Sequence, residues 1–133
     1  MKILIFVLCL CGLYNTAAAQ NIQKMSDAEQ LGMMAGFASA CGATNKLDDF
    51  ELISSRLIAN AATTEQAEKQ QIRVYMQAKF EAIQRQKNEA PLSCSEILES
   101  FNKLPLFNSI VYRDGSVKLP DGTWSKPLRS PKK

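Results

Sequence analysis

The 133-residue sequence contains no histidine. That absence removes the commonest general base, the imidazole metal ligand and the partner that activates serine or cysteine nucleophiles. The sequence also has no G-x-S-x-G elbow, no P-loop and no dinucleotide-binding fingerprint. Acid pairs occur at Asp48/Asp49 and Glu96/Glu99, but the dipoles of expected helices account for them. We therefore expect a non-enzymatic protein with no cofactor and no metal, and an acid-pair glycan hydrolase is the remaining catalytic alternative.

Long apolar runs are missing too, apart from one near the start of the sequence. It extends over Ile3–Leu13, follows Lys2 and precedes Ala17–Ala19, which is the order of parts in a secretory signal peptide. Crossing a bilayer takes about 20 apolar residues, so this run is too short for an anchor. We expect a signal peptide over residues 1–19, cleavage near Ala19, and a periplasmic or secreted mature protein without stable membrane insertion.

Cysteine is scarce, with four residues in the chain. Cys9 and Cys11 lie in the leader, which leaves Cys41 and Cys94 in the mature protein. An even pair in an exported chain favours one disulfide. Two reduced buried thiols or a redox couple are the alternatives, although no C-x-x-C is present. A loop of this length, once closed, stabilises a fold by about 4 kcal/mol.

Net charge is small. Loss of Lys2 from the 16 basic residues leaves the mature chain at +2 against its 13 acids. The charge is unevenly distributed, because the segment from Arg113 to the C-terminus contains two acids and six bases. The bases are Arg113, Lys118, Lys126, Arg129, Lys132 and Lys133. A mildly acidic body with a basic tail does not indicate a nucleic-acid-binding protein.

Four segments have the periodicity of helices, at residues 26–41, 47–61, 63–88 and 93–105. Ser26 and Ser93 each stand three residues before a glutamate, which is the spacing of a capping box. The expected buried faces are Leu31, Met34, Phe37 and Ala38; Leu47, Phe50, Ile53, Leu57 and Ile58; Ile72, Tyr75, Met76, Phe80 and Ile83; and Cys94, Ile97, Leu98 and Phe101.

These segments predict an all-α domain over residues 20–105, a small antiparallel bundle of about four helices. In an up-down-up-down order, the first helix ends and the fourth begins at the same pole. Cys41 and Cys94 occupy those two ends, so the disulfide fits this arrangement.

The pattern changes after Pro105. Asp114-Gly115 separates two β-forming stretches, and Asp121-Gly122 is a second turn signal. We expect a β-hairpin-like extension over residues 106–124 and a disordered basic tail over residues 125–133.

Two features are candidates for partner binding. Ala28, Gly32, Gly36 and Ala40 form a ridge of small residues, which indicates either a closely packed helix of the same chain or a groove for a partner. The second candidate is an aromatic and cationic patch in the extension, for an acidic partner or an anionic envelope polymer, unless Trp124 instead covers the core; its residues are Tyr112, Arg113, Lys118, Trp124 and Lys126.

The general type, an exported helical protein with one disulfide, resembles several bacterial periplasmic groups, and no motif of the chain selects one of them. We expect a protein that binds another protein, as an accessory of an envelope secretion or conjugation system. An immunity protein or inhibitor and a stress chaperone are the alternatives, and a homo-oligomer is left open.

Overall fold

The computed structural model describes residues 26–89 and 91–129. The signal peptide expected at residues 1–19 and the last residues of the expected basic tail lie outside this range. The elements, in chain order, are α2 (Asp27–Ala40), α3 (Asn45–Ala61), α4 (Glu65–Asn88), α5 (Cys94–Asn102), the 3₁₀ helix η1 (Pro105–Asn108), β1 (Ile110–Val111), β2 (Val117–Lys118) and β3 (Trp124–Ser125).

Side-chain caps explain where three of the helices begin. The hydroxyl of Ser26 accepts a hydrogen bond from the Glu29 amide at 3.2 Å, and that of Thr64 accepts one from the Ala67 amide at 3.0 Å. Ser93 caps α5 in the same way. Each bond satisfies one of the free amides in the first helical turn, which is why the predicted starts are accurate.

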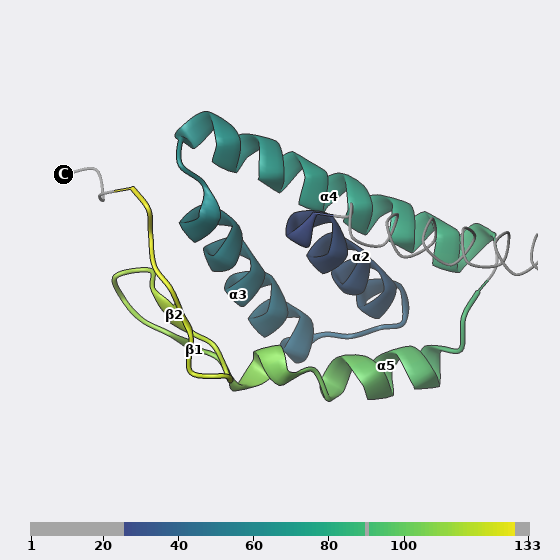
Figure 1. The fold of residues 1–133 in the computed structure, drawn as a ribbon. Helices are drawn as coiled ribbons and strands as arrows, with labels where there is room; N and C mark the ends of the chain where they lie inside the picture. Colours follow the sequence, from purple (N-terminus) through teal and green to yellow (C-terminus); the bar gives the residue numbers. More distant parts are fainter. Residues whose placement is uncertain (1–25, 90, 130–133) are drawn as a thin grey trace, which may run out of the picture.

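Helices α2 and α4 are packed in backbone contact (Figure 1). A methyl group added to Gly32 would lie 2.3 Å from the carbonyl oxygen of Tyr75, and one added to Gly36 would lie 2.4 Å from that of Lys79. The facing side chains on α4 include Ala78. Small residues on both helices therefore allow this close approach.

The α2–α4 contact overturns part of the buried face expected for α4. Tyr75 is buried as expected, and the inward positions around it are taken by Ala78, Ala82 and Gln86. Ile72, Met76 and Phe80 are exposed, contrary to the prediction. The reason is geometrical, since a large side chain between α2 and α4 would force the two backbones apart.

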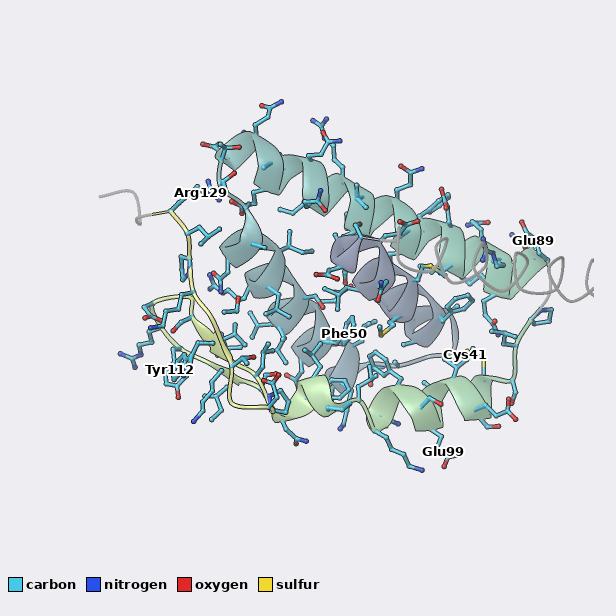
Figure 2. The ribbon with its side chains drawn as sticks, viewed as in Figure 1. Cys41, Phe50, Glu89, Glu99, Tyr112 and Arg129 are labelled. Carbon is cyan, nitrogen blue, oxygen red and sulfur yellow. A yellow bond between two sulfur atoms is a disulfide. The ribbon has the colours of Figure 1, made fainter. Side chains whose placement is uncertain are left out.

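The remaining core lies between α3, α5 and η1. Phe50 of α3 is fully buried, and its ring centroid lies 5.2 Å from that of Phe101 and 6.3 Å from that of Phe107 (Figure 2). Phe101 and Phe107 meet edge to face at 5.3 Å, a favoured geometry for aromatic rings. Ile97 and Leu98 of α5 are half-buried, whereas Cys94, expected to be buried, is exposed.

The disulfide between Cys41 and Cys94 is present, with 5.2 Å between the two Cα atoms. It joins the end of α2 to the first residue of α5, as the sequence predicts. The described part of the chain is thus mostly helical, with four α-helices and one disulfide. A regular antiparallel bundle is not confirmed, because α3 and α4 diverge from their junction and α5 runs across the far end of α3 (Figure 1).

The extension forms a three-stranded antiparallel sheet in the order β1-β2-β3, one strand more than the expected hairpin. Ser125, assigned to the tail by the sequence, pairs with Val117 in this sheet. Within residues 26–89 and 91–129, no helix has both the length and the apolar character to cross a membrane.

Candidate interaction surface

The sequence-predicted partner residues separate into two groups in the structure. Gly32 and Gly36 are buried against α4, so the element that approaches the small-residue ridge is a helix of the same chain. No space is left there for a partner, and these two glycines drop out of the candidate surface. The other four residues, Tyr112, Arg113, Lys118 and Trp124, all lie on or beside the sheet and are exposed.

The inner face of the sheet is held against α3 by one buried amide. The Nδ2 group of Asn60 donates to the carbonyl oxygen of Gly115 at 3.0 Å and to both the carbonyl and hydroxyl oxygens of Ser125 at 3.1 Å. Val117, between these two contacts, is fully buried. Because side chains alternate along a strand, this anchoring determines which residues point outward.

The outer face carries an aromatic pair. Lys118 is registered opposite both Ile110 and Trp124, which places these three residues on one face. The rings of Tyr112 and Trp124 lie 5.2 Å apart at an interplanar angle of 34°. Trp124 is 47% exposed, so it does not cover the core. Figure 2 shows Tyr112 on the side of the sheet that faces away from the helices.

Two ammonium groups flank the indole. The Nζ atom of Lys118 lies 5.8 Å from the Trp124 ring centroid and that of Lys126 lies 5.6 Å from it, both within cation–π range. Arg113 lies in the turn that follows Tyr112 and is also exposed. We define the sheet patch as Ile110, Tyr112, Arg113, Lys118, Trp124 and Lys126.

The two turns around the sheet patch are internally braced. Asp114 accepts hydrogen bonds from the hydroxyl and amide of Ser116, and these bonds lower the pKa of its carboxyl group. Asp121 accepts from the hydroxyl and amide of Thr123, with the same effect on its pKa. Both carboxylates are therefore used to shape the turns, and the sheet patch is supported on both sides.

Cavities lie between the described helices, and their walls differ in charge. One of about 540 Å³ lies between α3, α4 and the segment after β3, and its wall combines three bases with three acids, namely Arg56, Lys69, Arg129, Glu65, Glu68 and Asp114. Arg129 is paired there with Glu68, so the C-terminal segment is tied to the first turns of α4 (Figure 2). A balanced wall offers no net attraction to an ionic ligand.

The other cavities are mainly apolar. One of about 730 Å³ between α2, α3 and α4 has Asp27 as its one ionisable lining residue. Among the described residues, no cluster of three histidine, cysteine, aspartate or glutamate side chains is placed to hold a metal ion. Burial, reinforced by the neighbouring Glu51 carboxylate, raises the pKa of the Tyr75 hydroxyl, which keeps it protonated.

The exposed side chains of α4 were missed as a surface by the sequence analysis. Ile72, Met76 and Phe80 repeat every fourth residue, a spacing that predicts a buried stripe, but periodicity does not show which apolar face of a helix is buried. Ala78 and Ala82 could have revealed the packed face of α4, since they match the small residues of α2.

Comparison with known proteins found no relative: no protein-family model, no curated protein and no solved structure matches the chain.

Proposed function

We propose that this is an exported, non-enzymatic protein that binds an acidic segment of another protein on the sheet patch. The observation that carries the proposal is the half-exposed Trp124, stacked on Tyr112 and flanked by Lys118 and Lys126. A tryptophan left in water by a protein of this size, on a surface braced by two turns, has the features of a binding anchor.

The chemistry of the sheet patch favours an acidic protein partner. Tyrosine and tryptophan contribute large contact areas at low entropic cost, and they are enriched among residues that dominate binding energy. The surrounding cations attract carboxylates over several ångströms and speed association at low salt. Lys118 and Lys126 lie at the rim of the sheet patch, where their ammonium groups can stay hydrated while a partner covers the aromatic rings.

Export is part of the same proposal. The leader over residues 1–19 and the Cys41–Cys94 disulfide both suit an oxidising compartment, which for a bacterial protein is the periplasm. An accessory of an envelope secretion or conjugation system is the role that we favour. An immunity protein would use a surface of the same kind, and the identity of the captured partner separates the two roles.

The experiment uses the protein in its own host. A photo-crosslinking residue at Tyr112 should trap one dominant partner, and mass spectrometry should map the link to an acidic segment. The matched controls are Trp124→Ala in the sheet patch and Phe80→Ala, which removes an exposed aromatic ring from α4 instead. We expect Trp124→Ala to abolish capture and Phe80→Ala to leave it unchanged.

Affinity can then be measured with the purified partner segment. Isothermal titration calorimetry measures the Kd of both the wild type and Trp124→Ala; since Trp124 is the single tryptophan of the chain, its fluorescence can follow binding by the wild type alone. Truncating an anchor of this kind costs about 2 kcal/mol or more, roughly a thirtyfold rise in Kd. Recovery of no partner at any salt concentration, or equal recovery by Trp124→Ala, would refute the proposal.

A further inference from the structure

The hydrogen-bond register of the sheet shows which backbone groups of β1 face away from β2. The amide of Tyr112 donates to the carbonyl oxygen of Ser116 at 2.9 Å, so these residues form a hydrogen-bonded pair. Hydrogen-bonded and non-hydrogen-bonded pairs alternate along an antiparallel ladder. The next pair, Val111 with Val117, is therefore non-hydrogen-bonded, and the N–H and C=O groups of Val111 point away from β2.

This outer edge of β1 has no strand beside it in the part of the chain that the structure describes. The sheet order is β1-β2-β3, so β1 ends the sheet, and α3 packs against the other two strands. Among the described residues, no hydrogen bond uses the amide or the carbonyl oxygen of Val111. Unpaired edge groups of this kind are a template on which another extended segment can add as a strand.

The opposite edge of the sheet, on β3, is protected. By the same alternation the amide and carbonyl of Trp124 also point outward, but Lys126 and Pro127 follow directly. A lysine and a proline are two of the means by which proteins prevent pairing at an edge. Strand β1 consists of Ile110 and Val111, which are apolar and β-branched, and Ile110 is 53% exposed. The edge of β1 is therefore the one suited to receive a strand.

The alternation of side chains determines what sequence would fit there. The residue paired with Val111 would share its inward face, and Val111 is half-buried, so an apolar residue fits that position. The residues on either side of it would point outward, beside Ile110 and Tyr112 on the sheet patch. A segment in which acidic and apolar residues alternate meets both requirements.

Charge favours such a segment over a second copy of the chain. The sheet patch carries three bases, Arg113, Lys118 and Lys126, while the carboxylates of Asp114 and Asp121 accept hydrogen bonds within their own turns. A second copy would bring the same three cations to the edge, whereas acidic side chains compensate them.

We propose that the partner binds as an added strand on the free edge of β1, through a segment that alternates acidic and apolar residues. The inference rests on the proposed function, because it specifies how the sheet patch holds its acidic partner. The backbone of Val111 supplies one donor and one acceptor, and the outward side chains of the sheet patch select the acidic residues.

The probe is the synthetic peptide Glu-Val-Glu-Val-Glu with both ends blocked. Amide exchange measured by NMR should slow at Val111 when the peptide is added and stay unchanged at Trp124. Val111→Pro should raise the Kd about tenfold or more, because it removes the outward donor and places a ring where the added strand would run. The sheet should stay paired in this variant, since no ladder bond to β2 uses Val111.

Two matched controls isolate the backbone contact. Val111→Thr keeps the amide and the branched shape, and its Kd should not change. The same peptide N-methylated at both valines keeps its charges but lacks the donors for the Val111 carbonyl oxygen, and it should bind about tenfold more weakly or worse. Far-UV circular dichroism and the amide spectrum of each variant show whether the fold is intact.

The outcomes separate this inference from the proposed function. No binding of the peptide, unchanged exchange at Val111, or equal binding by Val111→Pro and Val111→Thr overturns the strand addition. If Trp124→Ala loses the peptide while Val111→Pro retains it, the sheet patch stands as the binding surface and the strand addition is wrong. Protection of the Val111 amide that grows with protein concentration alone would assign the edge to a second copy and would also overturn it.

Discussion

Replacing Gly32 or Gly36 by alanine tests the backbone contact between α2 and α4, because the sign of the effect depends on that contact. Glycine to alanine in an exposed helix stabilises by about 1 kcal/mol. Here the new methyl groups would lie 2.3 Å and 2.4 Å from carbonyl oxygens of α4, well inside van der Waals contact. Neither oxygen can rotate away, since each belongs to the backbone of a helix.

The magnitude follows from what must move. Relief of either clash requires α2 to separate from α4, which opens gaps along the whole row of small residues between them. Overpacking of this kind costs up to about 3 kcal/mol, and the gain in helix propensity offsets about 1. We expect each substitution to destabilise by about 2 kcal/mol and to lower Tm by roughly 10 °C. The double substitution should cost less than the sum, because the first one already separates the helices.

Urea unfolding of the oxidised protein, followed by circular dichroism, measures these values. Gly42→Ala is the control, since Gly42 ends α2 at φ +88° with nothing within 4 Å of an added methyl group. It should lose about 1 kcal/mol from backbone conformation alone. If Gly36→Ala instead stabilised the protein, as an exposed helical glycine would, the close packing of α2 on α4 would be refuted.

Three further measurements test other contacts. Alanine at both Cys41 and Cys94 should lower the free energy of unfolding by about 4 kcal/mol relative to the oxidised wild type, because the disulfide closes a loop of 53 residues; the reduced wild type is the control and should show the same loss. Asn60→Ala should leave the helices folded but speed hydrogen exchange of the sheet amides, since it removes all three hydrogen bonds from α3 to the sheet; unchanged exchange would contradict that anchoring. The pKa of Asp114 is lowered from 3.8 by its bonds from Ser116, so the stability of that turn is present above the unfolded value and is lost as pH falls through the folded one. Ser116→Ala should move the midpoint of the Asp114 NMR titration upward, and an unmoved midpoint would show that these bonds do not set it.

Local signals predicted the helices well. The starts of α2, α4 and α5 follow from a hydroxyl cap at Ser26, Thr64 and Ser93, and each cap acts within one turn of the chain. The end of α2 similarly follows from Gly42, whose positive φ needs no neighbour to justify it. Such features depend on a few adjacent residues, so a sequence contains all the information they require.

Tertiary choices were harder to predict. The small-residue ridge with Gly32 and Gly36 has the same pattern whether the approaching helix belongs to the same chain or to a partner, and only the structure identifies α4. The outward position of Trp124 was likewise one of two open alternatives. It depends on a hydrogen-bond network between Asn60 and residues far along the chain, which no local pattern reveals.

The outer face of the sheet and the exposed face of α4 are each determined by the contacts made on the opposite face of the same element. In the sheet, Asn60 and the buried Val117 fix the inner face, so the register turns Lys118 and Trp124 outward; a slip of one residue would exchange the two faces. In α4, the close approach of α2 places Ala78 and Ala82 at the contact, and the large apolar side chains of Ile72, Met76 and Phe80 lie on another face. The small-residue ridge thus does not form a groove itself, but its contact with α4 is what leaves Ile72, Met76 and Phe80 exposed to solvent.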